Sequence, residues 1–391
     1  MDSIRVAVIG IGNMGYAHAT CLAKKEIQGM CLAAVCDIDD NRLEAFREDY
    51  PWVKTFTDYN DLLQSGETDA VVIAVPHPLH AEIAVKALEN NLHVMLEKPA
   101  DIAVSKVKKL NEIAAKSGRV FGIMFNQRTN MLFQKAREIV QSGQLGELKR
   151  SVWIITNWYR TQSYYDSGDW RATWSGEGGG VLLNQAPHNL DLWQWICGMP
   201  QAVTAYCDVG KYHDIEVEDD VTIFVRYANG ATGTFITSTG EYPGTNRLEI
   251  SGTKGKIVIE NRTLKWWQLQ EDERVVCREA ADSFVTMETA YTETQQTEQE
   301  AAHKGILQNF ANAILYGEAL LAPGTDGILE LTLSNAAYLS AWKGHAEIAL
   351  PLDCEEFDWL LDERIASSRQ RTAEKGSAAS GGYHERWQVR W

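Results

Sequence analysis

Residues 4–15 read IRVAVIGIGNMG, and this stretch decides the fold of the first third of the chain. Its first six residues are mostly apolar and β-branched, as expected for a buried parallel strand. Gly10, Gly12 and Gly15 follow in the spacing G-x-G-x-x-G and lead into a segment that is compatible with a helix. Glycines at these positions permit a tight turn and a close approach of the backbone to a pyrophosphate, whose charge meets the amino end of the helix. Taken alone, the triplet is also compatible with a merely structural glycine turn.

The next segment strengthens this interpretation. Residues 31–37, CLAAVCD, form a second strand-like run that ends in Asp37, 22 positions after Gly15. In dinucleotide-binding folds an acid at this point binds the ribose hydroxyls, and it would repel the additional phosphate of NADP. Strand, glycines, helix, strand and acid in this order therefore predict a binding site for NAD.

The alternation of strands and helices continues through the first third of the chain. Strand-like runs occupy residues 69–76, 93–99 and 119–126, with helix-compatible segments between them. This pattern predicts a Rossmann doubly wound parallel sheet, which we assign to residues 1–127. A ligand of such a sheet lies beyond the carboxyl ends of the strands. The residues expected there are Pro76, His77, His80, Glu97, Lys98, Asn126, Gln127 and Arg128.

The composition opposes several classes of function. The chain of 391 residues has a formal net charge of −16, whereas a nucleic-acid partner would require a basic surface. No apolar stretch approaches the roughly 20 residues that span a bilayer, so we expect no membrane interaction. The chain runs straight into the first strand without a signal peptide, and its seven cysteines include no CxxC pair. We therefore expect a cytoplasmic protein with reduced thiols and no metal site.

Beyond residue 128 the sequence alternates like antiparallel strands, with hairpin turns at 229–230 and 252–255. The fold class expected for residues 128–350 is α+β, built on a large, mostly antiparallel open sheet and joined to the α/β domain that precedes it. Two segments with apolar helical periodicity, 297–316 and 325–343, predict helices that pack on this sheet or on the first domain.

Residues 351–391 are expected to form a C-terminal extension. In it, a linker of small residues precedes an aromatic, basic tip that contains Trp387 and Trp391. Such a tip could be a disordered tail, or it could dock on a neighbouring surface or subunit.

Aromatic residues are concentrated between positions 153 and 195. Flat aromatic side chains suit the apolar C–H faces of sugar rings, although packing in a core or an interface explains many of them equally well. The stretch 164–180 is typical of a loop that closes over a substrate. The candidates for substrate contacts in this region are Tyr159, Arg160, Asp169, Trp170 and Arg171.

A polar stripe runs through an apolar segment, LLNQAPHNLDLW at 182–193. Asn184, His188 and Asp191 are spaced i, i+4 and i+7, so an unbroken helix would present them on one face. Pro187 has no backbone donor, and a helix start or kink before His188 is therefore favoured. The alignment of Asn184 with His188 weakens as a result, whereas His188 and Asp191 stay on one turn.

Four of these motifs together resemble the glucose-fructose oxidoreductase, inositol dehydrogenase and rhizopine catabolism (Gfo/Idh/MocA) family. They are VIGIGNMG at 8–15, AVCD at 34–37, EKPA at 97–100 and GEGGGVLLNQAPHNLDLWQWICG at 176–198, and they occur in the family's order. The resemblance covers roughly residues 4–350. It implies a Rossmann domain followed by an α/β domain whose open sheet commonly mediates dimers and tetramers, and therefore a homo-oligomer.

The resemblance also implies roles for individual residues. The lysine of the EKP motif contacts the substrate hydroxyl in the family and is Lys98 here, although its position alone fits a solvated lysine equally well. The family's second motif, Asp-x-x-x-His, places its histidine at His188, which would accept the hydroxyl proton. Its aspartate is Asn184 here, which can bind a hydroxyl but cannot carry a proton, so a proton relay through position 184 is in doubt. Asp191 could orient His188, but we favour a structural role for its carboxylate.

We therefore expect an NAD-dependent dehydrogenase that oxidises a secondary hydroxyl of a sugar, glycoside or cyclitol, with the C3 hydroxyl of a glucoside as a narrower hypothesis. One alternative is a redox-neutral NAD-dependent glycosidase, in which Tyr159 or Asp169 would be an additional base. Another is a non-catalytic NAD sensor.

Three groups of residues are assigned to the site. The catalytic residues are Lys98 and His188. The cofactor residues are Gly10, Gly12, Asn13, Met14, Gly15, Asp37, Pro76, His77, His80, Glu97 and Lys98. The substrate residues are Asn126, Arg128, Tyr159, Arg160, Asp169, Trp170, Arg171 and Asn184.

Overall fold

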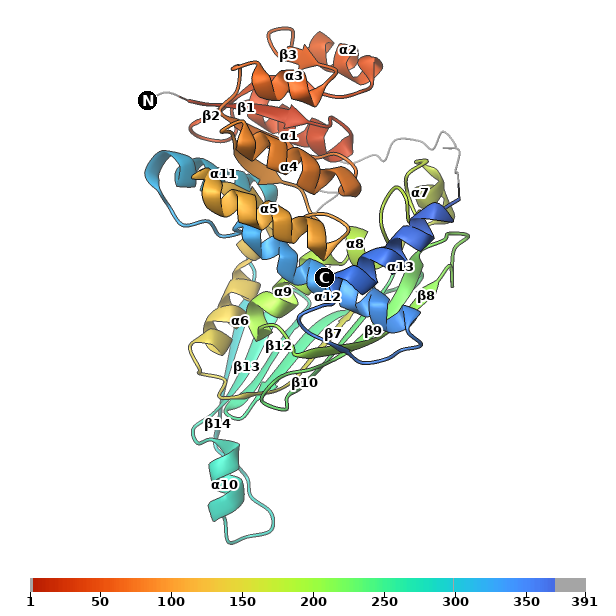
Figure 1. Cartoon of the computed structure of the whole chain (residues 1–391). Coiled ribbons are helices and arrows are strands. Elements are labelled where there is room, and N and C mark those ends of the chain that lie inside the picture. Colours follow the sequence, from red (N-terminus) through yellow and green to blue (C-terminus); the bar gives the residue numbers. More distant parts are fainter. Residues whose placement is uncertain (1–2, 298, 370–391) are drawn as a thin grey trace.

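The chain builds two sheets with helices packed on them (Figure 1). The computed structural model describes residues 3–297 and 299–369. In Figure 1 the parallel sheet and its helices form the upper part of the molecule, and the larger sheet forms the lower part. The boundary expected at residue 127 falls within the short helix η2 (Asn126–Thr129), where the chain passes from one region to the other.

The first sheet has six parallel strands in the order β3-β2-β1-β4-β5-β6, and it confirms the expected Rossmann fold. Its central strands are buried apolar runs because helices pack against the sheet. The strands are β1 (Ile4–Ile9), β2 (Met30–Cys36), β3 (Lys54–Phe56), β4 (Ala70–Ile73), β5 (His93–Leu96) and β6 (Phe121–Ile123). The helices are α1 (Asn13–Ala23), α2 (Asp40–Asp49), α3 (Tyr59–Gln64), η1 (His77–Leu79), α4 (His80–Glu89) and α5 (Val104–Ser117).

The second sheet has nine strands in the order β14-β13-β12-β11-β7-β10-β9-β8-β15. Every neighbouring pair is antiparallel except β7 and β10, so the expected mostly antiparallel sheet is confirmed. The hairpin turns expected at 229–230 and 252–255 join β9 to β10 and β11 to β12. The strands are β7 (Leu148–Ile155), β8 (Ala202–Val209), β9 (Glu218–Arg226), β10 (Thr232–Ser238), β11 (Asn246–Gly252), β12 (Gly255–Glu260), β13 (Thr263–Leu269), β14 (Thr289–Gln295) and β15 (Ile348–Ala349).

Nine further helical segments accompany the second sheet in the described part of the chain after η2. They are α6 (Met131–Gln141), α7 (Gln162–Asp166), α8 (Val181–Asn184), α9 (Pro187–Cys197), α10 (Glu273–Glu279), α11 (Ala302–Tyr316), η3 (Gly324–Asp326), α12 (Gly327–Trp342) and α13 (Cys354–Ala366). In Figure 1, α10 lies on an extension between β13 and β14, far from the first sheet.

Aromatic packing explains several of the tryptophans between 153 and 195. Trp193 of α9 and Trp153 of β7 are both buried and pack against Phe235 of β10, with ring centroids 5.5 and 6.1 Å apart. A Cβ added at Gly233 would lie 2.6 Å from the Trp193 ring, so a glycine in β10 makes room for the indole. These residues form the core between α9 and the sheet, and they are not available to a ligand.

The helices expected late in the chain pack back on the first domain. Lys304 of α11 forms an ion pair with Glu26, and Asn335 of α12 accepts a hydrogen bond from the backbone N–H of Val104. The structure adds α13, which occupies the beginning of the stretch expected to be an extension and stacks its buried Phe357 on Trp342. The aromatic tip with Trp387 and Trp391 lies outside the described residues.

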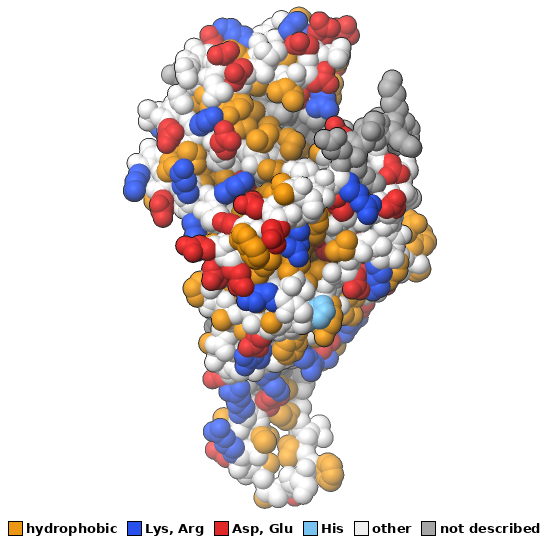
Figure 2. All heavy atoms as spheres, turned by 45° about the vertical axis from the view of Figure 1, so that its right-hand side comes forward, with side chains coloured by type: hydrophobic (Ala, Val, Ile, Leu, Met, Phe, Trp, Pro, Cys, Tyr) orange, Lys and Arg blue, Asp and Glu red, His pale blue; other side chains and the backbone are white. Residues whose placement is uncertain are grey.

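Charged side chains of both signs are intermixed over the face shown in Figure 2. All seven cysteines lie in the described part of the chain and are free thiols. Among the described residues, no helix is long and apolar enough to cross a membrane, and no group of His, Cys, Asp and Glu is arranged to hold a metal ion.

Candidate active site

The turn between β1 and α1 has the geometry of a dinucleotide cradle. Gly10 has φ +83°, and a Cβ there would lie 2.6 Å from the backbone oxygen of Ala74. A Cβ at Gly15 would lie 1.7 Å from the backbone oxygen of Gly10, so only glycine lets the helix pack against the turn. At Gly12 the nearest atom to an added Cβ is Arg42 Nη1 at 4.0 Å, which leaves open space at the amino end of α1. This space and the free N–H groups of the first helical turn, which opens with Asn13 and Met14, fit a pyrophosphate.

Asp37 lies beside this turn, at the end of β2. Its Oδ2 accepts from the backbone N–H of Ile11 at 2.8 Å, and its Oδ1 accepts from that of Asp39 at 3.0 Å. Arg42 Nη1 lies 3.5 Å from Oδ2. A carboxylate has about four acceptor positions, so Asp37 can also bind ribose hydroxyls. The donor set therefore fits the ribose of NAD.

His80 and His77 organise the turns that follow β4 and β5. The ring nitrogens of His80 lie 2.7 Å from the backbone oxygen of Pro99 and 2.8 Å from that of Val75, so this side chain holds the two turns together. His77 Nδ1 donates to the backbone oxygen of Glu177 at 3.0 Å and thereby ties η1, which begins after Pro76, to the second domain. Both histidines, which the sequence assigned to the cofactor, make these backbone contacts.

Glu97 is buried and pairs with a histidine of the dinucleotide-binding helix. Its Oε1 lies 2.7 Å from His18 Nε2. Burial alone would raise the pKa of Glu97, but the hydrogen bond to His18 and the nearby positive groups lower it to about 2. His303 of α11 lies next to His18, with ring centroids 5.7 Å apart, and its Nδ1 is 3.3 Å from Asn126 Nδ2. Glu97 and Asn126 thus belong to one polar group that joins both regions of the chain.

Lys98 and Asn184 meet where the two motifs converge. Helix α8 ends at Asn184 after a single turn, so the carbonyl oxygen of Asn184 is free to accept a hydrogen bond from Lys98 Nζ, at 2.9 Å. Pro187 begins α9, as expected from its missing donor, and the chain therefore breaks between Asn184 and His188. Burial lowers the pKa of Lys98 below its usual value, and nearby carboxylates oppose this shift only in part.

The surroundings of His188 keep its imidazole unprotonated. Its Nδ1 is buried and has no hydrogen-bond partner within the described part of the chain. Burial and the positive charges of Lys98 and His303 lower the pKa of His188 well below its usual value. The imidazole is therefore neutral near pH 7 and can accept a proton.

Asp191 and Arg128 have roles different from a substrate contact. Arg128 Nε and Nη2 donate to the two carboxylate oxygens of Asp191 at 2.8 and 2.6 Å, and Arg128 Nη1 lies 2.7 Å from Asp326 Oδ2. Both side chains of the Arg128–Asp191 pair are only 1% exposed. Asp191 is thus used in a buried ion pair and not in orienting His188. The same geometry corrects the expected substrate role of Arg128, because its guanidinium is already occupied by two carboxylates.

The loop after β7 carries the aromatic candidates, and only part of it faces the motifs. Arg171 lies between the rings of Trp170 and Tyr164, at 4.5 and 4.7 Å from their centroids. Trp170 in turn contacts His77, with ring centroids 6.1 Å apart. Trp170 and Arg171 are therefore brought to the cofactor side of the site.

The remaining candidates of this loop are Tyr159, Asp169 and Arg160. Tyr159 is 42% exposed and packs on Tyr242, and Asp169 is exposed. Arg160 places its guanidinium over the rings of Trp158 and Tyr164. Tyr159 and Asp169 are therefore open to solvent, whereas Glu97 and Glu177 near Lys98 are buried.

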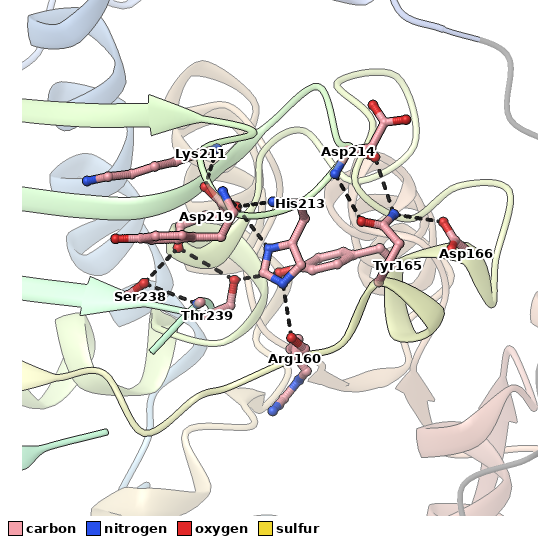
Figure 3. Close-up of polar contacts among 12 residues, drawn as sticks. Arg160, Tyr165, Asp166, Lys211, His213, Asp214, Asp219, Ser238 and Thr239 are labelled. Atoms are coloured by element: carbon pink, nitrogen blue, oxygen red, sulfur yellow. Dashed lines mark hydrogen bonds and ion pairs between the residues drawn. The ribbon is translucent and has the colours of Figure 1, made fainter. Parts of the chain in front are cut away.

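A buried polar cluster anchors this loop to the end of the sheet (Figure 3). His213 lies between Asp219 and the loop: its Nδ1 is 2.9 Å from Asp219 Oδ2, and its Nε2 donates to the backbone oxygen of Arg160 at 3.0 Å. Tyr165 and Thr239 share a hydrogen bond of 2.7 Å between their hydroxyls. The loop is therefore held at two points by β9, β10 and the segment between β8 and β9.

Sequence reasoning missed two buried carboxyl groups near the site, Glu177 and Glu330. Glu177 could have been noticed as the acid within the GEGGG motif. Glu330 of α12 is fully buried, and neither carboxyl oxygen has a partner within residues 3–297 and 299–369. Burial and the charge of Asp191 raise the pKa of Glu330 well above its usual value, so the group is a neutral acid. Its position 330 carries no local signal, because only tertiary folding brings α12 to Lys98.

A Rossmann domain joined to an open-sheet domain, with a lysine after β5 and a neutral histidine at the start of α9, fits an NAD-dependent dehydrogenase. Family models match residues 4–125 as the oxidoreductase family with an NAD-binding Rossmann fold and residues 133–258 as the GFO/IDH/MocA C-terminal domain. The chain belongs to this Gfo/Idh/MocA family.

Relatives and solved structures agree with this assignment. The chain is 26% identical to myo-inositol 2-dehydrogenase of Thermotoga maritima, over 85% of this chain and 95% of the relative. It is 24% identical to scyllo-inositol 2-dehydrogenase (NAD(+)) of Bacillus subtilis, over 85% and 93%. The WlbA dehydrogenase from Bordetella pertussis, solved in complex with NADH and UDP-GlcNAcA, superposes with a TM-score of 0.76 at 26% identity and covers 90% of this chain and 99% of its own.

Proposed function

We propose that this dehydrogenase oxidises a secondary hydroxyl of a sugar, glycoside or cyclitol. One observation carries the proposal: Lys98 and the neutral base His188 converge on the break between α8 and α9, and Glu97 beside Lys98 contacts His18 of the helix that follows the NAD turn. Relatives that act on inositols and a neighbour bound to a UDP sugar support polyol and sugar substrates as a class.

The side chains around this break have complementary tasks. Nδ1 or Nε2 of neutral His188 accepts the proton of the reacting hydroxyl. The Lys98 ammonium donates to the same oxygen and stabilises the negative charge that develops on it. Asn184 binds a neighbouring hydroxyl through its amide. NAD, when bound against Gly10, Gly12, Gly15 and Asp37, supplies the hydride acceptor.

The narrower proposal is oxidation at C3 of a glucoside. The loop that carries Trp170 and Arg171 supports its sugar part, because a flat indole beside a cation suits the faces and hydroxyls of a pyranose, and the C3 position is left to the product analysis below. The redox-neutral glycosidase would need a second base near the ring, and the two candidates for it, Tyr159 and Asp169, are exposed to solvent. We favour the dehydrogenase for this reason. A homo-oligomer remains part of the proposal.

A panel of hexoses, inositols and aryl glucosides, assayed with NAD and with NADP, tests the function. We expect NADH to accumulate with NAD, the glycoside to stay intact, and NMR of the product to show a ketone at C3 of the glucoside. Free aglycone without net NADH would instead support the glycosidase. Turnover that survives in both Lys98→Met and His188→Ala would overturn the proposed site.

A further inference from the structure

Glu177 joins three segments of the site. Its Oε2 accepts from the backbone N–H of Ala172 at 2.7 Å, and its Oε1 accepts a hydrogen bond from Asn184 Nδ2. Its backbone oxygen accepts from His77 Nδ1. One buried residue, 2% exposed, thus contacts the aromatic loop, the second motif and the turn after β4.

The two glycines beside Glu177 allow this position. A Cβ at Gly176 would lie 2.4 Å from the backbone oxygen of Trp170, and a Cβ at Gly178, where φ is +77°, would lie 2.3 Å from Ile102. The backbone at Gly176 and Gly178 is therefore in close contact with Trp170 and Ile102, and the Glu177 side chain between them is buried. Ala172 itself has φ +55°, a conformation that an alanine rarely adopts, and its N–H is bound by Glu177. The loop is held in this conformation by the same carboxylate.

The carboxylate decides which way the Asn184 amide faces. Burial raises the pKa of Glu177, but the charge of Arg171, the hydrogen bonds from Ala172 and Asn184 and the charge of Lys98 oppose this shift and favour the ionised form. An ionised carboxylate only accepts hydrogen bonds, so it selects the nitrogen of the amide and leaves Asn184 Oδ1 facing away from Glu177. The backbone oxygen of Asn184 accepts from Lys98 Nζ, so this residue also positions the ammonium. Two contacts therefore connect Glu177 with Lys98.

Asn184 and Glu177 form a hydrogen bond between an amide and a carboxylate, and only one of the two side chains can carry a charge. The family pattern has an aspartate where this chain has Asn184, and an aspartate there would lie against the Glu177 carboxylate in a buried site. Two adjacent carboxylates cannot both ionise without a large cost, and one of them would take up a proton. An asparagine next to a glutamate retains one negative charge and one amide, with a hydrogen bond between them.

We propose that Glu177 is a second buried carboxylate of this active site, besides Glu97, and that it is a positioning residue for Asn184 and Lys98. The inference rests on the proposed function, because it gives Glu177 a part, after that of Glu97, in keeping the Lys98 ammonium charged. The proposal implies that the carboxylate and the amide can exchange positions. With a glutamine at 177 and an aspartate at 184, the glutamine oxygen accepts from the backbone N–H of residue 172 and the glutamine nitrogen donates to the aspartate, so both hydrogen bonds of Glu177 are preserved.

The test compares wild type, Glu177→Gln, Asn184→Asp and the double variant with both changes. Each single change is expected to lower kcat by about tenfold or more, and the double variant is expected to recover most of it, because contacting residues couple strongly. The Kd for NAD, measured by fluorescence, is expected to stay within about twofold in all four. In Glu177→Gln the alkaline limb of the kcat–pH profile moves to lower pH, because Glu97 and Glu177 both raise the pKa of Lys98 against burial and the charge of Arg171, and only Glu97 then remains charged beside it.

A matched control is Glu216→Gln. Glu216 also accepts a backbone N–H from this loop, that of Trp174 at 2.8 Å, but its side chain binds at the surface near Ser368 and not the motif. It is expected to keep the wild-type pH profile. Losses in the two single variants that simply multiply in the double variant would overturn the proposal, as would an unchanged profile in Glu177→Gln.

Urea unfolding separates this proposal from the proposed function. Asn184→Asp places two carboxyl groups together, so its stability is expected to fall at pH 8 and to be regained in the double variant. That result needs no substrate. A wild-type enzyme that oxidises no polyol would defeat the proposed function, whereas additive stabilities at pH 8 would defeat the pairing of Glu177 with Asn184.

Discussion

The β1–α1 turn and the break between α8 and α9 both place functional groups at the end of an element, but they achieve it differently. In the turn the backbone itself is specified: Gly10 and Gly15 occupy positions where any Cβ would collide with a carbonyl oxygen. At the break, the chain supplies a proline and a short helix, and distant side chains complete the site. The comparison teaches that a site made of backbone is encoded locally, whereas a site made of side-chain partners depends on the whole fold.

The largest effect is expected from a matched pair of changes in the turn. Gly15→Val forces a Cβ into the backbone oxygen of Gly10, and we expect the Rossmann domain not to fold, seen as loss of soluble protein. At Gly12 an added Cβ meets no atom closer than 4.0 Å, so Gly12→Val should fold, but it fills the space for the pyrophosphate and should weaken NAD binding by about tenfold or more, that is by at least ~1.4 kcal/mol. Calorimetric titration of Gly12→Val with NAD measures this. Equal behaviour of the two variants would break the comparison.

At the break, the next largest effect should come from His188→Ala. Removal of the base is expected to lower kcat by about 10²–10⁴-fold, with little change in NAD affinity. Steady-state kinetics and NAD titration measure the two quantities. His345→Ala removes an exposed histidine that stacks on Tyr206, and it serves as the control with unchanged turnover. If His188→Ala retained full turnover, the base would have to be another group.

A large loss of stability is expected from Asp191→Ala. The change leaves the buried Arg128 guanidinium with only one of its two carboxylates, and breaking such a pair costs about 3–5 kcal/mol. Urea unfolding gives the value. The double change Arg128→Met with Asp191→Leu should recover much of the loss, because it removes both charges. A loss of less than about 1 kcal/mol in the free energy of unfolding of Asp191→Ala would show that the Arg128–Asp191 pair contributes no more than an exposed ion pair.

The smallest effect concerns the neutral acid Glu330. Its folded-state pKa is raised, so the folded protein binds more protons than the unfolded chain at pH values between the unfolded and folded pKa. The free energy of unfolding should therefore fall as the pH rises through this window. Glu330→Gln should match wild type near pH 4 and exceed it at pH 8, as followed by thermal and urea unfolding. A Glu330→Gln variant less stable than wild type at pH 8 would show that the carboxylate has a stabilising partner.

Local signals were sufficient for much of the fold. The glycine spacing and the acid at Asp37 predicted the Rossmann sheet, and Pro187 predicted the start of α9. The turn at 229–230 predicted a hairpin, because glycine supplies the positive φ that this turn requires. The helix α13 was not predicted, since its amphipathic pattern lies just before a linker-like sequence.

The site was predicted less completely, and the errors have a common cause. Arg128 follows a strand end, where ligand-binding residues gather, but Asp191 and Asp326 reach it from α9 and from η3, far away in the sequence. Tyr159 and Asp169 have suitable chemistry, yet the loop turns them outward. Residue type and local position do not report which partner a charged side chain will find.

By itself, the sequence determined the parallel sheet, the turn for NAD and the start of α9 at Pro187, because glycine conformations, proline and alternating apolar runs act over a few residues. Only the tertiary structure decided that Arg128 pairs with Asp191, that His188 is neutral, and that Glu177 lies against Asn184. Hydrogen bonds and charges are strong only at short distance and in a buried setting. Their outcome therefore depends on which segments folding brings together.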